Sequence, residues 1–145
     1  MNLTRRTGFA LASVMLLPQP ATAQISSSTQ ASVDRLRGSR ALQEGRITLR
    51  LPNIAENGNA VPLAVSVESP MTAADHVTRI HVFADRNPTP EVATFELTPA
   101  MGRAQADTRI RLAETQDVVV LAEMNDGAIF VARAEVRVTI GGCGG

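Results

Sequence analysis

The sequence predicts an all-β protein of one domain, built as two antiparallel sheets packed face to face. Short runs of alternating apolar and polar residues recur along the chain after residue 45, and Pro, Gly, Asn or Asp bounds most of them. No helical pattern separates these runs, which disfavours a parallel sheet with crossover helices. In a chain of this length the pattern is typical of an immunoglobulin-like β-sandwich.

The first 23 residues have the features of an export signal. Arg5 and Arg6 precede an apolar run over residues 8–17, and Ala21 and Ala23 supply the small residues of a cleavage site. The apolar run is shorter than the roughly 20 residues that a membrane-spanning helix needs. We therefore expect a twin-arginine-type signal peptide over residues 1–23, with cleavage after Ala23 and export to the periplasm.

The charge balance disfavours a nucleic-acid partner. The chain has 14 basic residues, all of them arginine, and 14 acidic residues, so its formal net charge is zero. Removing the signal peptide removes two arginines and no acid, which leaves a net charge of −2. The arginines are scattered rather than clustered with aromatic residues. With 44% hydrophobic residues but four Phe and no Trp or Tyr, the core must consist mainly of Val, Ile, Leu and Ala.

A polar lead-in and one short helix precede the first strand. Residues 24–31 are small and polar, and we expect them to be flexible. From Ser32 onward, Val33, Leu36 and Leu42 have helical spacing, and Gly45 lies just beyond them. The pattern predicts a short amphipathic helix that packs against the sandwich, within a domain over residues 32–140.

Seven strands are predicted from period-two alternation and turn residues. In the first, Ile47, Leu49 and Leu51 share one face. The last two are joined by the sequence Asn-Asp-Gly at 125–127, a strong hairpin signal. The predicted strands cover residues 46–52, 60–69, 77–85, 91–98, 107–114, 117–124 and 128–140.

The last two strands indicate where the core lies. The final strand alternates, with one apolar face and one solvated face; the apolar side chains are Phe130, Ala132, Ala134, Val136, Val138 and Ile140. The strand before it is apolar on both faces, with Val118 and Val120 on one and Val119 and Leu121 on the other. Such a strand is either central in the fold or covered by another chain, and we favour the central position.

The sequence offers little for metal binding or catalysis. The two histidines, His76 and His81, are predicted to lie on opposite faces of one strand, so neither a metal site nor catalytic residues are expected. His81 is expected to be a surface histidine. The carboxylates in polar strand positions are interpreted as ordinary solvated charges; they are Glu91, Glu96, Glu114, Glu123 and Glu135. No cofactor is expected.

The chain ends in "TIGGCGG", which places the only cysteine, Cys143, between two glycine pairs. Gly141, Gly142, Gly144 and Gly145 allow a flexible arm over residues 141–145, and three residues beyond Ile140 give it a reach of roughly 10 Å. Such an arm suits a thiol that carries a substrate covalently to other enzymes, since it cannot hold the sulfur at a fixed distance from a catalytic base. The alternative is a structural subunit whose tail cysteine forms an intermolecular disulfide.

The residues also resemble a known family, the thiosulfate-carrier Y subunit (SoxY) of the sulfur-oxidation (Sox) system. The similarity runs from about Leu36 to Gly145. It includes "IAENGNAVPLAVSVESPM" at 54–71, "IHVFADRNPTPEVATFELTPAMGRA" at 80–104, "TRIRLAETQ" at 108–116, "AEMNDG" at 122–127 and, most specifically, "VTIGGCGG" at 138–145.

The resemblance implies a role and a set of partners. A member of this family forms a periplasmic heterodimer with the Z subunit, a second immunoglobulin-like protein. A c-type haem enzyme joins thiosulfate oxidatively to the tail cysteine, here Cys143, as a cysteine S-thiosulfonate. A dimanganese hydrolase then releases sulfate, and a sulfur dehydrogenase or a storage route takes the remaining sulfane sulfur. The carrier itself catalyses none of these steps.

Overall fold

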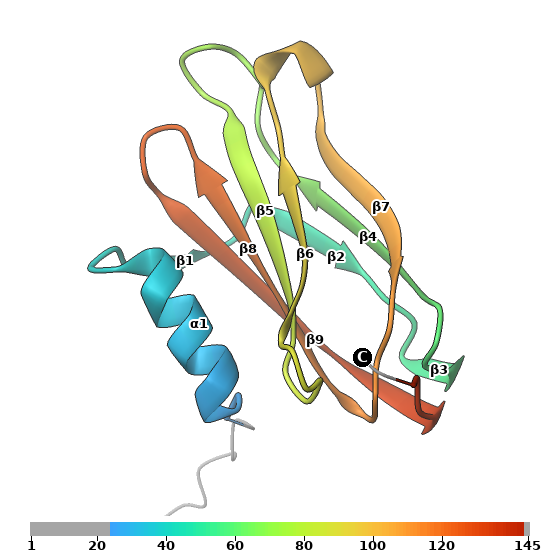
Figure 1. The fold of residues 1–145 in the computed structure, drawn as a ribbon. Helices are drawn as coiled ribbons and strands as arrows, with labels where there is room; N and C mark the ends of the chain where they lie inside the picture. Colours follow the sequence, from blue (N-terminus) through green and yellow to red (C-terminus); the bar gives the residue numbers. More distant parts are fainter. Residues whose placement is uncertain (1–23, 144–145) are drawn as a thin grey trace, which may run out of the picture.

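The computed structural model describes residues 24–143, which form two packed sheets and one helix (Figure 1). The larger sheet has the strand order β1-β9-β8-β5-β6, with β3 also paired to β9, and the smaller has the order β2-β4-β7. The bounds are α1 Ser27–Arg37, β1 Leu42–Glu44, β2 Ile47–Arg50, β3 Ile54–Asn57, β4 Val61–Val67, β5 Val77–Ala84, β6 Glu91–Glu96, a 3-10 turn Pro99–Met101, β7 Ala104–Ile110, β8 Gln116–Met124 and β9 Ile129–Ile140. The predicted all-β sandwich is confirmed.

Two short strands were not predicted, and they make the larger sheet mixed rather than purely antiparallel. Both β1 and β3 pair with β9 in parallel, β1 at residues 129–131 and β3 at residues 137–140. Between them in sequence, β2 pairs with β4 in the other sheet, so the chain crosses between the sheets and returns. Strands of three and four residues are too short to show an alternating pattern in the sequence.

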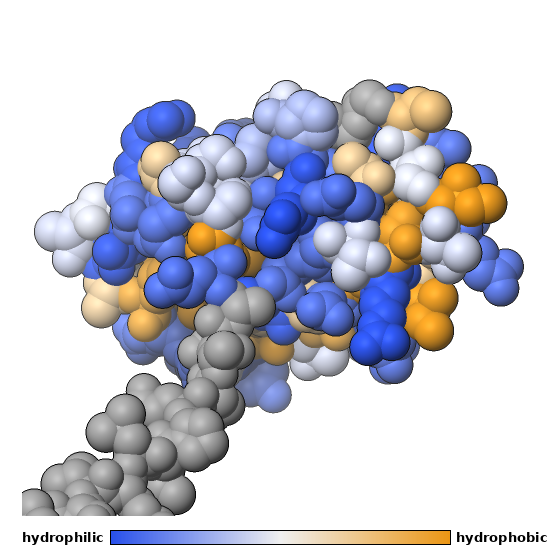
Figure 2. All heavy atoms as spheres, turned by 90° about the horizontal axis from the view of Figure 1, so that it is seen from below, coloured by the Kyte–Doolittle hydropathy of each residue, from blue (hydrophilic) through white to orange (hydrophobic). Residues whose placement is uncertain are grey.

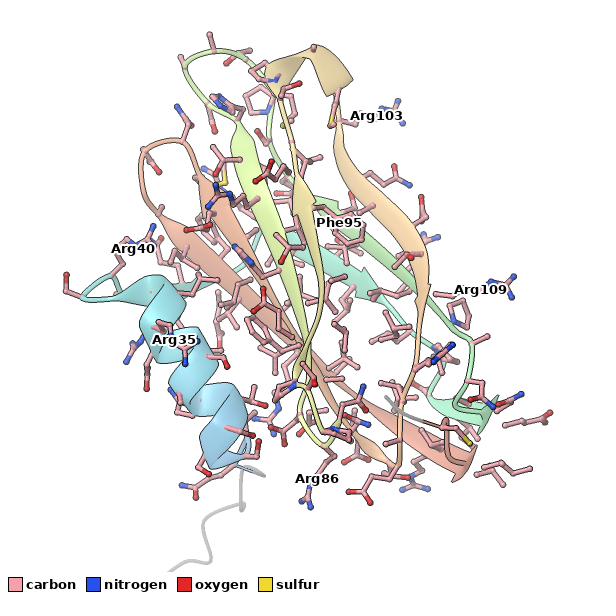
Figure 3. All side chains as sticks on the ribbon, in the orientation of Figure 1. Arg35, Arg40, Arg86, Phe95, Arg103 and Arg109 are labelled. Carbon is pink, nitrogen blue, oxygen red and sulfur yellow. The ribbon has the colours of Figure 1, made fainter. Side chains whose placement is uncertain are left out.

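The space between the sheets holds the main core. In β4, Val61, Leu63, Val65 and Val67 are buried while the residues between them are more exposed, as the alternation predicted. They belong to one cluster with inward-facing residues of the larger sheet, including Val120. Figure 3 shows Phe95 of β6 pointing into the same space. Burial of these branched side chains is the principal stabilising contribution to the sandwich.

A second, smaller core lies on the outer face of the larger sheet, where α1 covers it (Figure 1). Val33 of the helix packs there with Phe83, Val119, Leu121 and Ile129, all of them buried. Since Val118 and Val120 face the main core, β8 is apolar on both sides because protein covers both. The prediction that β8 is central is therefore confirmed.

The helix differs from the prediction at both ends. It begins at Ser27, inside the segment predicted to be a flexible lead-in. Ser26 caps it: its hydroxyl accepts from the backbone N–H of Thr29, and its own N–H donates to Asp85 Oδ1 at 2.7 Å. The helix ends at Arg37 with Gly38 at a φ of +59°, so Leu42 lies in β1 and not on the helix. A tertiary contact to Asp85 thus orders residues that look disordered in the sequence.

No helix in residues 24–143 is long and apolar enough to cross a membrane. The predicted signal peptide, residues 1–23, lies outside the part of the chain that the structure describes.

Candidate functional site

Cys143 lies at the end of a three-residue tail that continues β9 beside β3 (Figure 1). Its thiol is exposed and forms no disulfide within the described residues. Gly144 and Gly145, the outer pair of the predicted arm, lie outside the described residues. The geometry of the site therefore concerns Gly141, Gly142 and Cys143.

Backbone hydrogen bonds hold this tail between two loops. The Gly142 N–H donates to the Leu112 carbonyl at 2.8 Å, and the Leu112 N–H donates to the Gly58 carbonyl at 2.8 Å. The Gly58 N–H in turn donates to the Ile140 carbonyl at 2.7 Å. Three segments that are distant in sequence meet at this junction, and the inner half of the predicted arm is docked on the domain.

The glycines at the junction are explained by close approach. A Cβ atom on Gly141 would lie 2.2 Å from the Ala113 carbonyl oxygen, and one on Gly142 would lie 2.7 Å from the Gly58 carbonyl oxygen. A Cβ on Gly58 would lie 2.2 Å from the Leu112 carbonyl oxygen. All three distances are shorter than real Cβ contacts, so a side chain at any of these positions would force the neighbouring backbone to shift. The sequence interpreted Gly141 and Gly142 only as a source of flexibility, whereas the structure shows that they are also needed for packing.

Among the described residues, Asn59 is the one side chain that forms a hydrogen bond with the tail. Its Oδ1 accepts the Cys143 N–H at 3.0 Å. The Asn59 N–H donates to Asn57 Oδ1 at 2.9 Å, an Asx turn that shapes the loop. Sequence reasoning identified Asn57 and Gly58 as a turn but missed the contact to Cys143. No local signal could reveal it, because the partners are 84 positions apart.

The loop on the other side of the tail is itself fixed by Asn87, a buried residue. Asn87 Nδ2 donates to the Arg111 carbonyl at 2.8 Å, and Asn87 Oδ1 accepts from the Ala113 N–H at 3.0 Å. Gln116 Nε2 also donates to Asn87 Oδ1 at 3.0 Å. The Leu112 and Ala113 carbonyls that face the tail therefore have a rigid support.

The surface around the tail is partly apolar. Ile140 is 66% exposed at the end of β9, and Ile54 is 58% exposed in the neighbouring β3. Figure 2 views the molecule from below and shows apolar side chains among polar ones at the end where β3 and the tail lie.

The histidines lie in other surroundings, and the prediction for His81 was wrong. His81 is only 7% exposed on the outer face of β5, with Nε2 at 2.9 Å from Glu123 Oε2 and Nδ1 at 3.2 Å from Thr94 Oγ1. Glu123 was interpreted as a solvated charge, but its side chain is only 14% exposed. His76 precedes β5, and its Nδ1 lies 2.9 Å from the Thr72 carbonyl oxygen.

The Glu123 carboxylate is also paired with Arg40, whose Nη2 lies 3.2 Å from Glu123 Oε1. Burial acts to raise the pKa of Glu123, but the hydrogen bonds from His81 and Arg40 outweigh it and the pKa is lowered. Figure 3 shows Arg40 on the helix side of the sheet. The cluster is part of the structure beneath α1 and does not include the tail. Among residues 24–143, no group of three or more His, Cys, Asp or Glu side chains could hold a metal ion.

The fold and the tail together define a class, that of an immunoglobulin-like domain displaying one exposed thiol near its chain end. The family model described as "Sulfur oxidation protein SoxY" matches residues 33–143. The solved structure of the sulfur carrier protein SoxY from Chlorobium limicola f thiosulfatophilum is 34% identical, with a TM-score of 0.65. The match covers 79% of this chain and 98% of that chain. The protein belongs to the SoxY family.

More distant structures share the fold alone. Superoxide reductase (neelaredoxin) from Ignicoccus hospitalis is 16% identical with a TM-score of 0.57, over 65% of this chain and 80% of that one. A putative superoxide reductase from Thermotoga maritima is 18% identical with a TM-score of 0.56, over 67% and 93%. Among curated proteins, none matches this chain.

Proposed function

We propose that this protein is a covalent carrier of thiosulfate-derived sulfur and that Cys143 is the attachment point. The observation that supports this most directly is the free, exposed thiol at the end of the tail in a chain of the SoxY family. Its similar solved structure is described as a sulfur carrier protein. Because Cys143 is the only cysteine in the sequence, sulfur held through a disulfide-type bond has no other place to attach.

The proposed loading step is an oxidation. The Cys143 thiol and the outer sulfur of thiosulfate form an S–S bond, and the thiol releases its proton. Two electrons would leave one at a time to the c-type haem enzyme, and the product is a cysteine S-thiosulfonate with one negative charge. Water then cleaves the bond between the sulfane sulfur and the sulfonate group, which releases sulfate and a proton and leaves a persulfide on Cys143. A thiol that takes part in such exchange must be accessible to several proteins, as the exposed Cys143 is.

The partners and the compartment belong to the same proposal. We expect a heterodimer with the Z subunit in the periplasm, reached through a twin-arginine signal over residues 1–23. The c-type haem enzyme, the dimanganese hydrolase and the sulfur dehydrogenase would be transient partners that perform the chemistry. The placement of the histidines supports a non-enzymatic role, since His81 is bound to Glu123 and Thr94 under α1 rather than beside Cys143.

The test is intact-mass spectrometry of the protein purified from its native exported compartment during growth on thiosulfate. We expect mass increments for thiosulfonate and sulfane sulfur that map to the C-terminal peptide and disappear on reduction. The Cys143→Ser variant should fold as the wild type does and carry none of these increments. The same samples also show whether the chain begins at Gln24.

The alternative, a structural subunit tethered through Cys143, predicts a different spectrum. The cysteine would appear only as a disulfide to another chain, and Cys143→Ala would abolish that link while leaving thiosulfate oxidation intact. Either result would overturn the carrier proposal.

A further inference from the structure

We propose that Asn59 is a positioning residue for Cys143, acting through a clasp that holds the inner half of the tail. The clasp consists of Gly58 and Asn59 on one side of the tail and Leu112 and Ala113 on the other. When it is closed, the thiol is displayed at one place on the surface; when it opens, the whole arm is released. The biological meaning of the clasp rests on the proposed carrier role, but its existence can be measured without any sulfur adduct.

Two hydrogen bonds hold the described part of the tail beyond Ile140. One is the backbone bond from the Gly142 N–H to the Leu112 carbonyl, and the other runs from the Cys143 N–H to Asn59 Oδ1. Only the second depends on a side chain, so Asn59 is the one position where substitution removes a tail contact without touching the backbone. The Cys143 bond is solvent-exposed. An exposed bond of this kind changes an opening equilibrium by about two- to tenfold.

The position of Asn59 is fixed by hydrogen bonds of the turn that do not involve Gly142 or Cys143. The Asn57 carboxamide accepts the Asn59 N–H at 2.9 Å, and the neighbouring Gly58 carbonyl accepts the Leu112 N–H at 2.8 Å. The first bond shapes the turn and the second ties it to the opposite loop, and together they fix the position from which Asn59 Oδ1 faces the tail. The acceptor is therefore pre-organised, and closing the clasp orders only the tail.

The clasp decides how far the sulfur can travel. With the Gly142 and Cys143 amides bound, the Cys143 side chain is the part of the described tail that can still turn. With the clasp open, the arm pivots at Ile140 instead of at Cys143, which adds three residues and roughly 10 Å of reach. A sulfur atom that must enter another protein's channel needs the open state, whereas the closed state keeps the thiol at the domain surface.

The chemical identity of Asn59 suits a carrier of anions. Its carboxamide oxygen accepts the Cys143 N–H without placing a full negative charge beside the sulfur. An aspartate would make the same hydrogen bond, but its charge would repel a thiosulfonate on Cys143. Aspartate therefore separates the hydrogen-bonding role of this position from its electrostatic role.

The experiment is amide hydrogen exchange, followed by NMR on the ¹⁵N-labelled protein with a reduced, unmodified thiol. In Asn59→Ala, the Gly142 and Cys143 amides should exchange about two- to tenfold faster than in the wild type. Asn59→Asp should restore slow exchange, because the acceptor is kept. Position 59 is remote in sequence from both amides, so the substitution does not alter their intrinsic exchange rates.

Asn125→Ala is the matched control. Asn125 also sits in a turn, where its side chain accepts the His76 N–H and donates to the Ala74 carbonyl, but it does not contact the tail. It should leave the Gly142 and Cys143 exchange rates unchanged. The proposal is overturned if Asn59→Ala leaves both rates at the wild-type value, or if Asn125→Ala accelerates them equally.

A second measurement connects the clasp to carriage. With the thiosulfate-coupling enzyme, Asn59→Ala should lower the KM for the carrier, because the population of the open arm rises. Asn59→Asp should slow turnover, because its charge repels the anionic adduct on Cys143. If the exchange rates respond but Cys143 never acquires sulfur, the proposed function fails and the clasp remains. If sulfur is carried but the exchange rates do not respond, the clasp fails and the function remains.

Discussion

Replacing Gly58 by alanine puts a methyl carbon at the junction of the turn, the tail and the loop that follows β7. The new Cβ would lie 2.2 Å from the Leu112 carbonyl oxygen and 2.7 Å from the Gly142 nitrogen. A real Cβ keeps at least 3.0 Å from such atoms, so the Leu112 carbonyl must move by about 0.8 Å. That carbonyl accepts the Gly142 N–H at 2.8 Å, and a displacement of this size breaks the bond.

The expected loss of stability combines two costs. Forcing an extra carbon into a packed site typically costs about 1–3 kcal/mol. Losing one backbone hydrogen bond costs about 1 kcal/mol more. We therefore expect Gly58→Ala to lower the free energy of unfolding by about 2–4 kcal/mol. For a domain of this size that corresponds to a fall in Tm of roughly 8–16 °C.

Urea unfolding of the mature chain measures the stability, and amide exchange at Gly142 measures the release of the tail. Gly102→Ala is the matched control, because Gly102 has a φ of +72° but no atom within 4 Å of an added Cβ. It should cost only backbone strain, about 1 kcal/mol, and leave the tail docked. Wild-type stability together with a protected Gly142 amide in Gly58→Ala would refute the reasoning, since the junction would then have room for a side chain.

Three further predictions concern the rest of the fold. Because the folded-state pKa of Glu123 is lowered, its ionised carboxylate stabilises the fold above the ordinary pKa of 4.5, and this contribution disappears as the pH falls through the folded-state value. The wild type should therefore lose its advantage over Glu123→Gln in urea titrations as the pH is lowered below 4.5; a constant difference would contradict this. Val120→Ala empties part of the main core, where Val120 is fully buried, and should cost about 2 kcal/mol in the same assay, whereas a cost near zero would mean that the sheets repack. Ser26→Ala removes the helix cap and one contact to Asp85, so far-UV circular dichroism should show earlier thermal fraying and a loss of about 1 kcal/mol; an unchanged melting curve would show that the cap is dispensable.

The strands show how much of a sandwich is readable from local pattern. The alternation in β4 and the two-sided apolar character of β8 correctly located the central strands and the hairpin, whereas Ile140, predicted on the apolar face of β9, is 66% exposed. The reason is that side chains in a strand point alternately to opposite faces, so the alternation of apolar and polar residues predicts which face is buried. By contrast, β1 and β3 form because they pair with the edge of the long strand β9. Their three or four residues are too few to predict this pairing from the sequence.

The buried histidine shows the corresponding limit for charged groups. The sequence predicted that His81 lies at the surface on a sheet face, but it could not show that α1 and its flanking residues cover that face. The interpretation as a surface residue failed because burial there depends on a helix packed from elsewhere in the chain. The register places Leu121 opposite His81, so the contact with Glu123 is diagonal, and sequence reasoning did not attempt to specify that register.

For the tail, too, some features follow from the sequence and others only from the tertiary structure. The sequence by itself determined that the only thiol lies near the chain end between glycines, because composition and position are local properties. Only the tertiary structure decided that Gly58, Gly141 and Gly142 approach other backbones too closely for a Cβ, and that Asn59 binds the Cys143 N–H. The sequence does not distinguish a glycine that gives the backbone flexibility from a glycine that allows another backbone to approach closely. The difference depends on which atoms, brought from distant parts of the chain, lie beside it.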